Sequence, residues 1–103
     1  MFVVALTYTA PLERIDELIS DHVAWLDRNY AAGALLASGR RVPRTGGVIL
    51  VSGSVSRDEL DAVLAADPFA VAGVAEYDVV EFVPSKTAAG LEALAASWAP
   101  GPG

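Results

Sequence analysis

The 103-residue chain has no cysteine and only one histidine. Disulfide bonds and thiolate zinc sites are therefore excluded, and one histidine is too few for most other transition-metal sites. Basic residues are also scarce, since seven Lys and Arg stand against 13 Asp and Glu for a net charge of −6. This acidic balance argues against nucleic acid and anionic membranes as partners. No phosphate-binding glycine motif is present either. We expect no metal and no cofactor.

The sequence also lacks an apolar run long enough to span a membrane. Residues 1–6 lack the basic segment of a signal peptide, so a cytoplasmic protein is expected. Hydrophobic residues are nevertheless abundant, at 53% of a chain long enough for only one small domain. This surplus predicts that apolar surface is shared with a second copy of the chain.

Four short segments have the composition of β-strands: residues 2–8, 35–39, 48–52 and 74–83. The first and third are apolar at successive positions, which is typical of strands that are covered on both faces. In the last segment, the residues expected to form the apolar core are Val79, Val80, Phe82 and Val83.

A long helix is predicted after the first strand, from Pro11 to about Ala32, with Gly33 at its end. At about 100° per residue, its apolar side chains fall on one arc. The members of this arc are Leu12, Ile15, Leu18, Ile19, Trp25, Leu26 and Tyr30. His22 lies near the middle of the arc, so the only histidine is expected to face inward.

A second helix is predicted after Ser56 and Glu59, which form a capping box. Its inner face carries Leu60, Val63 and Leu64. Asp67 would fall on the same face if the helix continued. Pro68 makes strict continuation unfavourable, because the residue before a proline avoids the α region. We therefore predict a separate helical turn from Pro68 to Ala72 that leads into the last strand.

The predicted order β-α-β-β-α-β is the ferredoxin-like arrangement of the α+β class, with two helices on one face of an antiparallel sheet. Residues 1–84 would form this domain. Residues 85–103 would form an extension with a small helix over residues 87–98 and a flexible tail. Strands apolar on both faces need a second cover, which a partner's sheet would supply in a homodimeric α+β barrel. The tail helix folded over that face is the alternative.

Three motifs follow one another on these elements: HVAWL at 22–26, GALLASG at 33–39, and ADPF at 66–69 followed by AGV at 72–74. Over residues 2–83 the chain resembles the YCII-like domains, in the dimeric α+β-barrel group. The resemblance implies that His22 and Asp67 form a catalytic pair. It also implies proton transfer or elimination on small cyclic, often phenolic, compounds. Arg40 departs from the family, which often has proline there, and makes the mouth of the pocket more cationic.

The His22–Asp67 pair also has a chemical rationale of its own. An imidazole takes up and releases a proton near neutral pH, and a carboxylate against it fixes its tautomer and stabilises its protonated form. Structural interpretations remain open for both residues. A histidine on an apolar helix face is often a hydrogen-bonded core residue, and Asp67 before Pro68 is a sound helix N-cap. Capping is compatible with membership of a site.

Further candidates for substrate contacts are Tyr8, Ser38, Arg40 and Phe69. Tyr8 and Ser38 lie at strand ends where pockets of this fold open. Arg40 begins an arginine-rich hairpin loop over residues 40–47, which either clamps an anionic substrate or is simply solvated. Nothing marks Ser38 as an activated nucleophile.

Two functions are compatible with these observations. The first is a small cofactor-free lyase or isomerase, with His22 as general acid and base and Asp67 as its orienting partner. The second is a non-catalytic domain that binds a small ligand or only dimerises. Burial of two ionisable groups favours the enzyme, because such groups are costly unless paired or used. The lack of a second strong catalytic group favours the binding domain. A cavity that reaches the pair would distinguish them.

Overall fold

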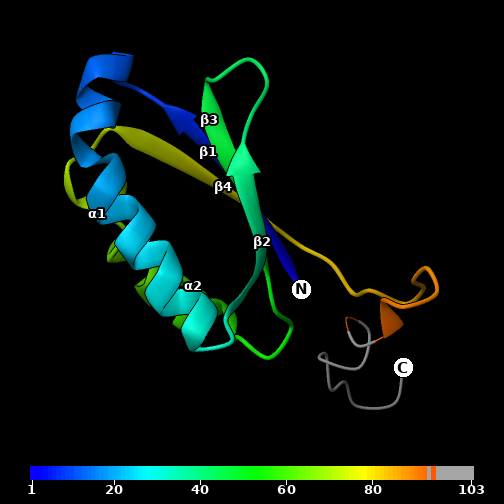
Figure 1. The fold of residues 1–103 in the computed structure, drawn as a ribbon. Coiled ribbons are helices and arrows are strands. Elements are labelled where there is room, and N and C mark those ends of the chain that lie inside the picture. Colours follow the sequence, from blue (N-terminus) through cyan, green and yellow to red (C-terminus); the bar gives the residue numbers. More distant parts are fainter. Residues whose placement is uncertain (93, 95–103) are drawn as a thin grey trace.

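The computed structural model describes residues 1–92 and 94. Its elements are β1 (Phe2–Tyr8), α1 (Leu12–Ala31), β2 (Leu35–Arg40), β3 (Gly46–Val51), α2 (Arg57–Ala65), α3 (Pro68–Val71) and β4 (Ala75–Glu81). The strands form one antiparallel sheet in the order β2-β3-β1-β4. The helices lie on one side of this sheet (Figure 1). The predicted α+β ferredoxin-like fold is confirmed. In the described part of the chain, no helix is long and apolar enough to cross a membrane.

The helix ends lie where local sequence chemistry places them. Gly33 adopts a φ of 77° directly after the C-cap of α1, a conformation that glycine adopts at little cost. At the start of α2, the Ser56 side chain accepts from the Glu59 N–H, and the Glu59 carboxylate accepts from the Ser56 N–H. The predicted capping box is therefore present. α3 is a separate turn after Asp67, as Pro68 requires.

The core lies between the helices and one face of the sheet. Alternate residues of β1 point to this side, and Phe2, Val4 and Leu6 are all buried. Trp25 of α1 is buried against them and its indole N–H donates to the Val63 carbonyl at 3.0 Å. This bond ties α1 to α2 and fixes the inner face of α1, which carries the histidine.

The opposite face of the sheet is apolar and only partly covered. Val3 pairs with Leu50 on one side and with Val80 on the other. Val80 is 55% exposed, and Val48 on the same face is 40% exposed. The expected core of the last strand is therefore corrected. Of the four expected residues, only Val79 packs against the core. Val80 points to the opposite face of the sheet, and residues 82 and 83 lie beyond the end of β4.

The segment after β4 differs from the prediction of a helix over residues 87–98. Residues 87–91 are not helical, since Gly90 has a φ of 93° and lies in a turn. The Glu92 carboxylate accepts from the Gly90 N–H at 2.9 Å. Glu92 and Leu94 are helical, whereas the rest of the predicted helix, including Trp98, lies outside the described residues. Figure 1 shows residues 82–90 leading away from the helices.

Candidate active site

The inward-facing histidine of α1 meets the aspartate that precedes α3. His22 Nδ1 lies 2.8 Å from Asp67 Oδ1, and both side chains are buried. Their positions follow from local sequence, since His22 lies in the apolar arc of α1 and Pro68 ends the preceding helix at Asp67. The structure thus shows the contact that the sequence led us to expect.

Asp67 combines the structural and the site interpretations. Its Oδ1 accepts from the Phe69 N–H at 3.0 Å, as an N-cap does, and also meets the His22 ring. Its Oδ2 accepts from the Tyr77 hydroxyl at 2.6 Å. The residue is 0% exposed. These three hydrogen bonds hold the carboxylate in one orientation against the imidazole.

The plane of the His22 ring is set by two aromatic neighbours. Phe69 stacks on it at 4.1 Å between ring centroids and 11° between planes, and Trp25 lies at 5.4 Å and 29°. Because Nδ1 is engaged by Asp67, Nε2 is the ring nitrogen that is left for a ligand. The imidazole is therefore held in one position and one orientation.

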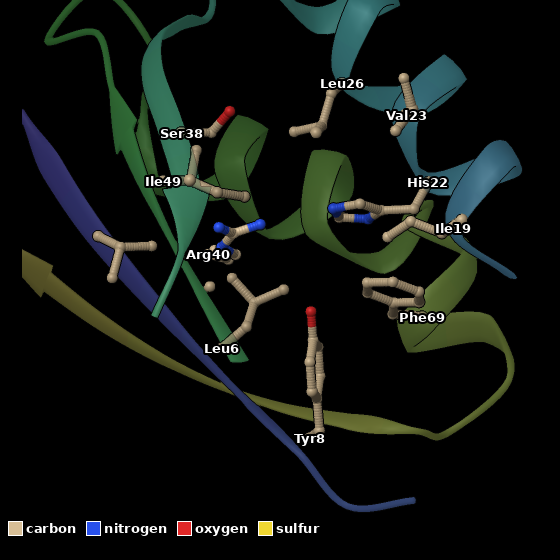
Figure 2. Close-up of a pocket in the computed structure, with 13 residues that line it drawn as sticks. Leu6, Tyr8, Ile19, His22, Val23, Leu26, Ser38, Arg40, Ile49 and Phe69 are labelled. Carbon is tan, nitrogen blue, oxygen red and sulfur yellow. The ribbon is translucent and has the colours of Figure 1, made fainter. Parts of the chain in front are cut away.

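His22 lines a cavity of about 270 Å³ between α1, α3 and the sheet. Most of its wall is apolar, with side chains from Leu6, Ile19, Val23, Leu26, Ile49 and Phe69. The polar side chains at its wall are His22, Tyr8, Ser38 and Arg40. Figure 2 shows these four side chains around a common space, with His22 from α1, Tyr8 from β1, and Ser38 and Arg40 from β2. An apolar cavity with a few convergent polar groups is the usual form of a small-molecule site.

All four predicted contact residues line this cavity, although their surroundings differ. Tyr8 packs edge-on against Phe69, with ring centroids 5.8 Å apart. The Ser38 hydroxyl lies 2.6 Å from the hydroxyl of Tyr30, so it is already oriented by α1. Arg40 belongs to β2 rather than to the following loop, and the sheet directs it toward the cavity.

The predicted cluster of hairpin arginines is divided in the structure. Arg41 donates to the Thr7 hydroxyl at 3.2 Å. Arg44 pairs with Asp16 of α1, and this hydrogen bond raises the pKa of the guanidinium. Arg40 alone of the three lines the cavity. The shared anion clamp is therefore reduced to one guanidinium.

Tyr77 is the contact that sequence reasoning missed. It lies on the helix-facing side of β4, in register with Leu6, and its hydroxyl reaches Asp67. Burial and the hydrogen bond to Asp67 raise the pKa of this phenol well above its ordinary value, so it stays protonated and donates. The available signal was the two-residue alternation of β4, which places Tyr77 and Val79 on the same face.

Within the described residues, no group of three or more His, Cys, Asp or Glu side chains is arranged to hold a metal ion. The arrangement that is present is an oriented imidazole, a guanidinium and two hydroxyls around an apolar space. Such a set can bind a small ring compound with polar substituents and exchange a proton with it.

The sequence model of the YCII-related domain matches residues 1–83. This chain belongs to the YCII-related family. No curated protein matches it. Among solved structures, it is similar to 5-chloro-2-hydroxyhydroquinone dehydrochlorinase from Burkholderia phenoliruptrix AC1100, in complex with 2,5-dihydroxybenzoquinone. The TM-score is 0.66 at 20% sequence identity, over 80% of this chain and 93% of that chain. The likeness supports the ferredoxin-like fold of this YCII-related chain.

Proposed function

We propose that this YCII-related protein is a small cofactor-free enzyme that performs proton transfer or elimination on a small cyclic, phenolic compound. The observation that carries the proposal is the hydrogen bond between the buried Asp67 and His22, the member of the pair that lines the cavity. A histidine held in this way has one nitrogen fixed by the carboxylate and the other available to a substrate. The solved relative, a dehydrochlorinase in complex with a dihydroxybenzoquinone, supports this class of compound.

In the proposed reaction, His22 Nε2 takes the proton of a ring hydroxyl or ring carbon of the substrate. The electron pair that is released forms a new double bond in the substrate, and an anionic leaving group departs or a proton returns at another position. Asp67 remains ionised and stabilises the imidazolium that forms. Neither route needs an external oxidant or reductant, so the residues of this chain suffice for the proposed reaction.

Arg40 and the apolar wall would provide substrate selection. A guanidinium binds an ionised ring oxygen, while Leu6, Ile49 and Phe69 contact the faces and edges of the ring. Tyr8 and Ser38 would donate to or accept from further ring oxygens. A cavity of about 270 Å³ suits a single substituted ring.

The experiment is a screen of halogenated and halogen-free hydroquinones, phenols and lactones for turnover and for binding. Halide release and ultraviolet absorbance report turnover, and calorimetry reports binding. We expect at least one compound to turn over, and His22→Gln to lose about 10²–10⁴-fold, the usual contribution of general acid–base catalysis. Asp61→Asn on α2, an exposed residue paired with Arg57, is the control.

Two outcomes would contradict the enzyme proposal. Binding in the cavity without turnover of any compound would favour the non-catalytic ligand-binding domain. Turnover that survives His22→Gln unchanged would place the chemistry elsewhere.

A further inference from the structure

Each oxygen of the Asp67 carboxylate has a separate task in the structure. Oδ1 meets the His22 ring and the Phe69 N–H at 2.8 and 3.0 Å. Oδ2 accepts from the Tyr77 hydroxyl at 2.6 Å. Phe69 and Asp67 belong to one short segment, whereas Tyr77 comes from the sheet. The hydrogen bond from Tyr77 therefore fixes how the carboxylate is rotated relative to the sheet, which forms one side of the cavity.

Tyr77 is suited to this task by its position. Its partner in β1 is Leu6, a wall residue of the cavity, and its ring packs against the core. The hydroxyl is thereby carried to Asp67 by a rigid strand and a rigid ring with two side-chain torsions. Because the phenol remains protonated, it is a permanent donor to the carboxylate.

We propose that Tyr77 is a positioning residue for the His22–Asp67 pair, which sets the basicity of His22 through Asp67. This role rests on the proposed function. Tyr77 does not line the cavity, so it acts through the carboxylate rather than on the substrate.

The direction of the effect follows from the charges in each protonation state. When His22 is neutral, only hydrogen bonds offset the charge of the Asp67 carboxylate, and the hydrogen bond from Tyr77 stabilises it most. When His22 is protonated, the imidazolium already offsets that charge. The Tyr77 hydroxyl therefore favours the neutral imidazole. Its removal should make His22 hold its proton to higher pH.

The titration of His22 also depends on the other groups that face it. Asp67 lies before α3, Tyr77 on β4, Arg40 on β2 and Tyr8 on β1. The Tyr77→Phe substitution removes only the hydroxyl of Tyr77 and leaves the other three groups in place. The ring that packs against the core is kept.

The test is the NMR titration of the His22 ring signals in the parent, Tyr77→Phe and Asp67→Asn proteins. We expect the midpoint of the His22 titration to rise in Tyr77→Phe by on the order of half a pH unit. A shift of this size corresponds to part of the free energy of one hydrogen bond, because the Tyr77 bond is present in both protonation states and differs only in strength. In Asp67→Asn it should fall. Tyr30→Phe, which removes a hydroxyl bonded to Ser38 instead, is the matched control and should leave the midpoint unchanged.

The two variants separate the two proposals. An unchanged or lowered midpoint in Tyr77→Phe, with the expected fall in Asp67→Asn, would overturn the role of Tyr77 alone. No fall in Asp67→Asn would overturn the proposed function. If Tyr77→Phe does not fold, 3-fluorotyrosine at position 77 offers the opposite change. Its more acidic hydroxyl should lower the midpoint, and an unchanged midpoint would again overturn the proposal.

Discussion

The two faces of the sheet differ in how completely a single chain covers them and pairs their polar groups. On the face that the helices cover, every buried side-chain nitrogen and oxygen in the described part of the chain has a hydrogen-bond partner, and Asp67 alone has three donors. On the other face, Val48 and Val80 remain 40% and 55% exposed. The proposed chemistry thus rests on residues of one chain, whereas the apolar face calls for a cover from elsewhere. We propose that a second copy supplies it.

The largest expected effect on stability comes from removing the Asp67 carboxylate on the face that the helices cover. Asp67→Ala leaves the His22 ring, the Tyr77 hydroxyl and the Phe69 N–H without their acceptor. We expect a loss of about 3–5 kcal/mol in the free energy of unfolding, measured by urea denaturation. Asp61→Ala, which breaks an exposed ion pair on α2, should cost less than about 1 kcal/mol. Equal losses in the two variants would show that the Asp67 network contributes little to stability.

The apolar face is tested by the mass of the protein in solution. Light scattering behind a sizing column should give twice the 10.7 kDa chain mass. Val80→Glu should give the monomer mass at micromolar concentration, because a charge on the shared face is costly to bury. Val42→Glu, in the hairpin loop at 92% exposure, should remain dimeric. A parent protein that is monomeric would contradict the shared barrel and favour the C-terminal segment as the cover.

Removal of residues 85–103 sharpens the same comparison. The sheet and its three helices are complete by Glu81, so the shortened chain should fold. We expect it to lose about 1–2 kcal/mol of unfolding free energy, the size of an ordinary local change. Circular dichroism and urea denaturation provide the measurement. Complete unfolding of the shortened chain would show that the segment after β4 belongs to the main core.

Local sequence chemistry predicted most of what positions the pair. The capping box at Ser56, the proline after Asp67 and the apolar arc around His22 act within a few residues, so their geometry can be read from the chain. These features correctly indicated that His22 and Asp67 would meet. The catalytic use of the pair stays a prediction, as does the division at residue 84.

Features that depend on the sheet were harder to predict. Tyr77 was missed because the last strand was interpreted as a run of apolar residues, and only strand alternation separates its two faces. Arg40 was assigned to a loop, but pairing with Gly47 extends β2 to include it. The helix start at residue 87 was wrong because Gly90 takes a left-handed conformation.

The smallest expected effect on stability is a loss at alkaline pH that depends on Tyr77. Folding raises the pKa of Tyr77 above its ordinary value of 10.0, through burial first and then the hydrogen bond to Asp67. Above about pH 10 the unfolded chain loses this proton while the folded chain keeps it. The stability contribution is therefore complete below pH 10 and is lost as pH rises further. Urea midpoints should fall less steeply in Tyr77→Phe than in the parent or in Tyr30→Phe. Equal slopes would contradict the buried phenol.

The most direct test of the His22–Asp67 pair is the pH titration of its imidazole. His22 is the only histidine, so its ring signals can be followed by NMR without assignment. Asp67→Asn keeps the size and most of the capping ability of the side chain and removes its charge. We predict that His22 titrates at lower pH in Asp67→Asn than in the parent, by about one pH unit or more. An unchanged titration would show that the two residues are not coupled, and the proposed active site would be wrong.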